Sequence, residues 1–181
     1  KGYFDIIAAV DEFIFYDEMQ YTNRDWRNRN QIKTPQGVQW LTVPVGESRK
    51  RRIMDVTVSD SKWQKKHWRS LETNYRRAPH YDEISAWLEP LYTGERYANL
   101  SYLNYKFIAA ICNYLGIRTV ISSSCDYNLI EGKTERLADL CEQAGATECI
   151  SGPAAKGYIE EDVFIRRGVK LSWFDYIDYP E

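Results

Sequence analysis

The last third of the chain alternates short β-forming runs with helical patterns, and this alternation constrains the fold more than any other feature. Apolar runs at 118–122, 147–150 and 170–174 are separated by amphipathic segments at 134–144 and 160–167. Strands that alternate with helices across short connections pair in parallel. The sequence therefore predicts an α/β fold with a mostly parallel, Rossmann-like sheet flanked by helices.

The first two thirds of the chain predict a different set of elements. They are a helix at 4–10, a strand at 12–16, a β-hairpin at 29–33 and 38–45, a short strand at 56–58, and helices at 62–77, 81–91 and 101–115. Glycines at 116, 145 and 168 follow helical patterns as C-cap residues. We expect the hairpin and the central helices to form an inserted layer within a single domain.

Composition limits the classes of function. The chain has 181 residues, a formal net charge of −2 and a pI near 5.8, which excludes a general nucleic-acid binder. No apolar stretch approaches the roughly 20 residues of a membrane span, and no signal peptide is visible. The four cysteines form no CxxC pair and lie far from the two histidines, so we expect reduced thiols and no metal site. These features indicate a cytoplasmic protein, and a homodimer is left open.

The segment 16–30 carries the densest mixture of functional side chains. It follows an apolar run at 13–15 and combines acids, aromatics, amides and three arginines. Polar groups just beyond the end of a buried strand are where α/β proteins place ligand sites. This segment is therefore the first candidate for binding an anionic ligand.

Individual residues of this segment suggest separate roles. Arg24, Arg27 and Arg29 can each hold a phosphate or carboxylate by two parallel hydrogen bonds. Trp26 and Tyr21 can stack on a ring. A structural cluster of salt bridges with the neighbouring acids is the alternative interpretation.

Two loops in the last third offer weaker anion sites. Lys133 and Thr134 begin a helical pattern, where backbone N–H groups and a lysine can hold a phosphate, although the full P-loop spacing is absent. Ser151 and Lys156 bracket a loop of small residues after a predicted parallel strand. A plain helix cap and a plain strand-to-helix turn are the alternatives.

Candidates for acid–base chemistry are few. Asp17 lies at the start of the polar segment and can act as a base. His67 lies among lysines on a predicted helix, where positive charge favours the neutral base; a packed structural histidine is the alternative. No cofactor is predicted.

An ordered set of motifs along the chain resembles the WbqC-like protein family. The motifs occupy residues 2–7, 11–21, 24–30, 40–45, 66–68, 74–79, 115–117, 131–137 and 150–156. Members are bacterial and occur in gene clusters for O-antigen and other surface polysaccharides. The resemblance also implies an N-terminal strand and a C-terminal segment in natural members, so we expect residues 1–181 to form one α/β domain that lacks both.

The resemblance implies a function in surface-polysaccharide biosynthesis. The first hypothesis is a transferase that acts on a nucleotide-linked amino sugar, with Asp17 or His67 as base and a sugar nucleotide as small-molecule substrate. A nucleotidyltransferase-like enzyme is the second hypothesis. A non-catalytic binding or scaffold subunit of the biosynthetic complex is the third.

Overall fold

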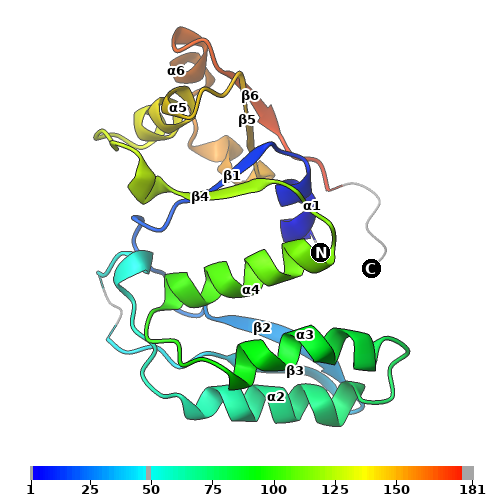
Figure 1. Cartoon of the computed structure of the whole chain (residues 1–181). Helices are drawn as coiled ribbons and strands as arrows, with labels where there is room; N and C mark the ends of the chain where they lie inside the picture. Colours follow the sequence, from blue (N-terminus) through cyan, green and yellow to red (C-terminus); the bar gives the residue numbers. More distant parts are fainter. Residues whose placement is uncertain (1, 48–49, 177–181) are drawn as a thin grey trace. The chain divides into compact units, whose positions relative to one another are not determined.

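The protein is described by a computed structural model that covers residues 2–47 and 50–176. The chain divides into two compact units, which are described separately: unit 1 comprises 1–16 and 116–181, and unit 2 comprises 17–115. Unit 2 is thus inserted in the sequence between the first strand and the second half of unit 1 (Figure 1). The α/β class is confirmed. A single domain over 1–181 stays a prediction, since two compact units can fold together or apart.

Unit 1 contains two pairs of parallel strands. Strand β1 (Glu12–Phe15) pairs with β4 (Val120–Ser123), and β5 (Glu148–Ser151) pairs with β6 (Lys170–Trp173). Helix α1 (Gly2–Ala8) precedes β1. The parallel pairing confirms the prediction, but the described strands form two-stranded sheets rather than one continuous sheet, so a Rossmann-like arrangement is confirmed only in part.

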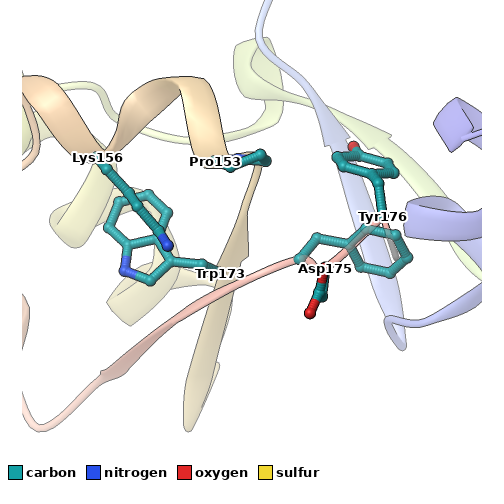
Figure 2. Close-up of a pocket in the computed structure, with 6 residues that line it drawn as sticks. Pro153, Lys156, Trp173, Asp175 and Tyr176 are labelled. Atoms are coloured by element: carbon teal, nitrogen blue, oxygen red, sulfur yellow. The ribbon is translucent and has the colours of Figure 1, made fainter. Parts of the chain in front are cut away.

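The β5–β6 pair is covered by two helices. Helix α5 (Thr134–Gln143) contacts β5, and α6 (Glu161–Arg166) contacts β6. Both helices end at a glycine with positive φ, as the sequence predicts, because a left-handed residue closes the last turn without a Cβ clash. At the carboxyl edge of the pair, Pro153 follows β5 and Trp173 ends β6 (Figure 2).

Unit 2 joins a β-hairpin to three helices. The hairpin strands are β2 (Arg29–Thr34) and β3 (Gly37–Thr42), and the helices are α2 (Lys62–Tyr75), α3 (Tyr81–Thr93) and α4 (Leu100–Tyr114). Helix α2 packs against β2 and α3, and α3 packs against α4 (Figure 1). The strand predicted at 56–58 is wrong: a 3₁₀ turn occupies Ile53–Asp55, and only isolated bridges at Val58 and Thr57 follow it.

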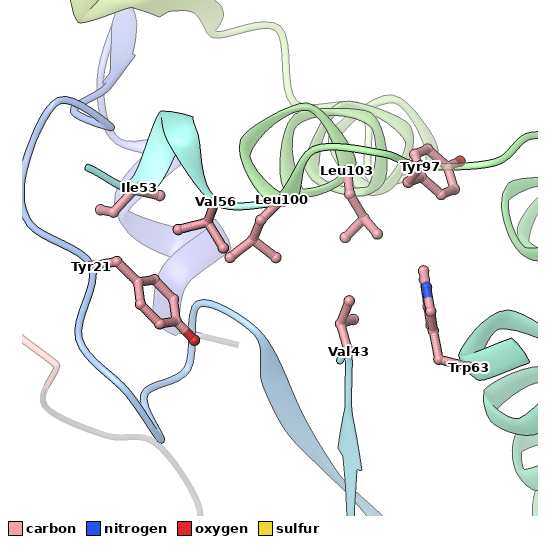
Figure 3. Close-up of a cluster of buried hydrophobic side chains, with 8 residues drawn as sticks. All are labelled: Tyr21, Val43, Ile53, Val56, Trp63, Tyr97, Leu100 and Leu103. Carbon is pink, nitrogen blue, oxygen red and sulfur yellow. The ribbon is translucent and has the colours of Figure 1, made fainter. Parts of the chain in front are cut away.

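A mixed aromatic and aliphatic core holds unit 2 together. Its buried members come from α2, α4, the 3₁₀ turn and the connecting segments next to these elements and the hairpin (Figure 3): Tyr21, Val43, Ile53, Val56, Trp63, Tyr97, Leu100 and Leu103. Val56 and Leu100 are wholly inaccessible to solvent. Because they are also joined by a backbone hydrogen bond of 2.9 Å from Leu100 N to Val56 O, the start of α4 is the centre of this core.

Two adjacent residues of α6 should contribute very differently to the stability of unit 1. Phe164 has 0% exposure, whereas Ile165 is 62% exposed. Phe164→Ala should lower the free energy of unfolding by about 3–5 kcal/mol because it leaves a cavity. Ile165→Ala should change it by less than about 0.5 kcal/mol. Chemical denaturation of the two variants measures both values, and equal losses would contradict the packing.

Candidate functional site

The polar segment after β1 is anchored to the rest of unit 2 by backbone hydrogen bonds. The amide of Tyr21 donates to Arg51 O at 2.8 Å, and that of Met54 donates to Asp17 O at 2.9 Å. The segment therefore runs beside residues 51–54 instead of lying free in solvent. This pairing fixes the backbone of residues 17–21.

Asp17 is a half-buried carboxylate beside helix α4. The Ser101 hydroxyl of α4 donates a hydrogen bond to Asp17 Oδ2. Burial raises the pKa of Asp17 above its ordinary value, although the Ser101 hydrogen bond and the positive charge of Arg27 both act to lower it. A carboxylate whose pKa is raised in this way accepts a proton more readily than an exposed one.

Arg27 lies at the centre of a polar network. Its Nη1 donates to Thr22 Oγ1 at 2.7 Å and forms an ion pair with Asp25, and Thr22 Oγ1 donates to Asp25 Oδ2 at 2.6 Å. Burial alone would raise the pKa of Asp25, but the Thr22 hydrogen bond and the Arg27 charge hold it below its ordinary value. The Asn104 amide of α4 donates to Arg27 O at 3.0 Å, so the same helix positions Arg27 and Asp17.

An exposed aromatic pair flanks this network. The rings of Trp26 and Trp40 lie 5.2 Å apart at 45°, and the two residues are 64% and 40% exposed. The Arg29 guanidinium lies 4.1 Å from the Trp40 ring centroid and donates through Nη2 to Arg24 O. Arg24 has a φ of 58°, and this left-handed turn directs its carbonyl at Arg29. The result is an aromatic surface with a fixed positive charge.

A cavity of about 470 Å³ opens beside the network. Its lining residues are Gln20, Tyr21, Thr22, Asn23 and Lys50. Tyr21 is only 4% exposed and contributes mainly to the core of unit 2. Burial, followed by the negative charge of Asp25, raises the pKa of its phenol. The stacking role predicted for Tyr21 stays a prediction, and Trp26 offers the more accessible ring.

His67 lies apart from these groups, in the aromatic core of unit 2. Its Nε2 lies 3.2 Å from Thr42 O, and its ring is 5.0 Å from that of Trp63. Burial lowers the pKa of the imidazole, although the contact with Thr42 O opposes this shift. The structure thus supplies every feature of a packed structural histidine, and the catalytic role of His67 stays a prediction.

The predicted anion-binding residues of unit 1 lie in two separate segments. Lys133 precedes α5 and is exposed, while Thr134 is buried, with Oγ1 accepting from Glu160 N at 3.3 Å. Ser151 ends β5, and Lys156 lies in the 3₁₀ turn Pro153–Gly157 that follows it. Thr134 therefore ties two segments together, whereas Lys133 and Lys156 present charges to solvent.

A second cavity, of about 440 Å³, lies at the carboxyl edge of β5 and β6 (Figure 2). Lys156 Nζ lies 5.7 Å from the Trp173 ring centroid. The other lining residues are Pro153, Phe174, Asp175 and Tyr176. The sequence predicted Lys156 here but not its aromatic neighbours.

Three positioning residues of unit 2 escaped the sequence analysis. Ser101 and Asn104 are three residues apart, a spacing that places both on one face of a helix, but nothing in the sequence indicated what that face contacts. Trp40 was placed on the hairpin without a role.

Neither a metal cluster nor a membrane span occurs in the described part of the chain. Over residues 2–47 and 50–176, no group of three His, Cys, Asp or Glu side chains could hold a metal ion. Within the same ranges, no helix is both long and apolar enough to cross a membrane.

Comparison with known proteins gives one family. The model of the WbqC-like protein family matches residues 1–181. The chain belongs to this family. The WbqC-like chain is also 54% identical over 183 residues to the uncharacterized protein Rv1507c of Mycobacterium tuberculosis (strain ATCC 25618 / H37Rv), an alignment that covers all of this chain and 79% of that protein. No solved structure matches this WbqC-like chain.

The two carboxylates of the network should affect the stability of this WbqC-like protein in opposite directions. Because the pKa of Asp17 is raised on folding, ionisation of this carboxyl lowers the free energy of unfolding, and the loss is complete once the pH has risen through the folded-state pKa. Asp17→Asn should therefore raise the free energy of unfolding at pH 7. Asp25→Asn should lower it, because the depressed pKa of Asp25 contributes stability above the unfolded-state value. Urea denaturation at pH 7 tests both signs.

The buried imidazole predicts a pH dependence on the acid side of neutrality. Because the pKa of His67 is lowered on folding, the folded state resists its protonation, and the free energy of unfolding should fall as pH drops below about 6.5. Denaturation between pH 7.5 and 5.5 should show a shallower slope for His67→Gln. The matched control is His80→Gln, since His80 is exposed. Equal slopes in wild type and His67→Gln would contradict this assignment.

Proposed function

We propose that this WbqC-like protein is a cytoplasmic transferase of bacterial surface-polysaccharide biosynthesis that acts on a nucleotide-linked amino sugar. The observation that carries the proposal is the half-buried Asp17 carboxylate, which accepts a hydrogen bond from Ser101 and whose pKa responds to the positive charge of Arg27. Carboxylates whose pKa is perturbed by burial and by a nearby cation are typical of functional sites.

Asp17 is the base of the proposed reaction. Transfer of a group to an amine or hydroxyl requires that the acceptor lose a proton as its nitrogen or oxygen attacks. That proton passes to an Asp17 carboxylate oxygen while the bond to the leaving group breaks. Burial raises the proton affinity of Asp17, and the Ser101 hydroxyl orients the carboxylate.

Arg27 is the phosphate-binding group. In the free protein its guanidinium is half-buried and paired with Asp25 and Thr22. A guanidinium has five N–H donors, so a phosphate can bind to Arg27 while part of this network persists. Arg29, fixed over Trp40, adds a second positive charge on the same segment.

Trp26 and Trp40 form the surface for the sugar ring. Exposed tryptophans present a flat apolar face, and a sugar ring can lie against such a face. The exposure of Trp26 and its contact with Trp40 support this role. A nucleotidyltransferase-like enzyme and a scaffold subunit are the alternative hypotheses.

Binding of uridine diphosphate N-acetylglucosamine tests the role of Arg27. Arg27→Ala should weaken binding about ten- to hundredfold, because a hydrogen bond to a charged group contributes about 1.5–3 kcal/mol. The free variant should lose no more than about 1 kcal/mol of stability, since its ion pair is partly exposed. Calorimetric titration and thermal denaturation measure the two effects.

The control is Arg69→Ala, which removes an exposed arginine from α2 of the same unit. This variant should bind the sugar nucleotide as the wild type does. Equal affinities for Arg27→Ala and wild type would overturn the assignment of Arg27. Absence of any sugar-nucleotide binding, with retention of a partner from the biosynthetic complex, would favour the scaffold hypothesis.

A further inference from the structure

The cavity at the carboxyl edge of β5 and β6 combines three kinds of recognition group. Lys156 supplies a positive charge, Asp175 a carboxylate, and Trp173, Phe174 and Tyr176 aromatic rings (Figure 2). Carboxyl edges of parallel strands are the usual ligand sites of open α/β sheets. All of these residues belong to unit 1, so the cavity is complete within that unit.

We propose that this cavity binds a ribonucleoside 5′-phosphate. In this assignment Asp175 accepts hydrogen bonds from ribose hydroxyls, Lys156 pairs with the phosphate, and the aromatic residues contact the base. The inference is independent of the reaction proposed for Asp17 and Arg27, because it uses no residue of unit 2.

The place of Asp175 in the chain supports the ribose assignment. The segment β5–α6–β6 is a βαβ unit with parallel strands, and Gly152 directly follows its first strand. Asp175 comes just after the second strand, about 20 residues beyond Gly152, which is the position of the ribose-binding carboxylate in nucleotide-binding βαβ units. A Cβ added at Gly152 would meet no atom within 4 Å, so the backbone there is open to a ligand.

The phosphate cannot be held as it is in the dinucleotide-binding units. There it lies at the N-terminus of the helix that follows the glycine-rich turn. Here the G-x-G-x-x-G pattern is absent, and α6 is a short helix with Glu160 as its N-cap and the acidic residues Glu161 and Asp162 in its first turn. This end of α6 repels an anion, so the positive charge must come from elsewhere.

Lys156 supplies that charge. It lies in the 3₁₀ turn between β5 and α6, and its Nζ is 5.7 Å from the Trp173 ring centroid. The cation–π contact keeps the ammonium beside the cavity while its N–H donors stay available for a phosphate oxygen.

The aromatic residues complete the site for a base. Phe174 N donates to Ser151 O at 2.8 Å, which extends the strand pairing one residue beyond β6 and fixes the positions of Trp173 and Phe174. The rings of Phe174 and Tyr176 lie 4.8 Å apart at 63°. Aromatic rings bind bases by stacking with little preference for sequence, so these contacts do not select among the four bases.

The carboxylate argues against a simple anion site. A lone phosphate would be attracted by Lys156 but repelled by Asp175. A ribonucleotide satisfies both, because it carries hydroxyl donors and a phosphate on opposite sides of one sugar. The mixed charge of the lining thus favours a ligand with both groups.

Calorimetric titration of the whole chain with AMP, GMP, CMP and UMP tests the proposal. At least one of these nucleotides should bind to saturation, and its affinity should be higher than that of inorganic phosphate. Lys156→Met should weaken that nucleotide about tenfold. Wild type should prefer the ribonucleotide over its 2′-deoxy form, and Asp175→Asn should lose most of that preference.

Matched controls separate this site from that of unit 2. Lys65→Met removes an exposed lysine of α2 and should leave nucleotide binding unchanged. Arg27→Ala should also leave mononucleotide binding unchanged, so the two proposals fail independently. The indole N–H resonance of Trp173, identified by its loss in Trp173→Phe, should shift on titration. No saturation by any of the four nucleotides, or wild-type affinity in both cavity variants, would overturn the inference.

Discussion

The start of helix α4 is the contact on which the candidate site of unit 2 depends. Leu100 is wholly buried against Val56, and the Asn99 side chain caps the helix at Tyr102 N while its amide donates to Met54 O at 2.6 Å. The helix is thereby fixed in rotation. Ser101 and Asn104 then face the polar segment and hold Asp17 and the backbone of Arg27. A shift at the core would move both candidate groups together.

The same arrangement makes the ionised form of Asp17 energetically unfavourable. Burial of Asp17 disfavours its charged form, and this penalty is only partly offset by Ser101 and Arg27. Proteins retain such groups where activity requires them. Asp25 shows the opposite case a few residues away, because its hydrogen bonds and ion pair stabilise the carboxylate. Two acids on one segment thus have pKa values shifted in opposite directions.

The predictions that succeeded rest on local patterns. Alternating strands and helices, with glycines after α5 and α6, specify a βαβ unit because these signals act within a few residues. The strand predicted at 56–58 is reduced to isolated antiparallel bridges, Thr57 with Asn99 and Val58 with Val45. The 3₁₀ turn at Ile53–Asp55 precedes it and α4 begins at Leu100, so the pairing cannot extend into a longer ladder. His67 lies on a helix, as predicted, but only packing shows that its ring joins Trp63 in an aromatic core.

The sequence by itself determined the family, the α/β class and the arginine-rich segment, since each is predicted from short runs of residues along the chain. Tertiary structure decided which side chains meet. Ser101 reaches Asp17 and Asn104 reaches Arg27 across more than seventy residues, and Trp173 meets Lys156 only because β5 and β6 pair in register. Such contacts depend on how helix faces and strand ends pack against each other, and no local pattern of residues specifies that packing.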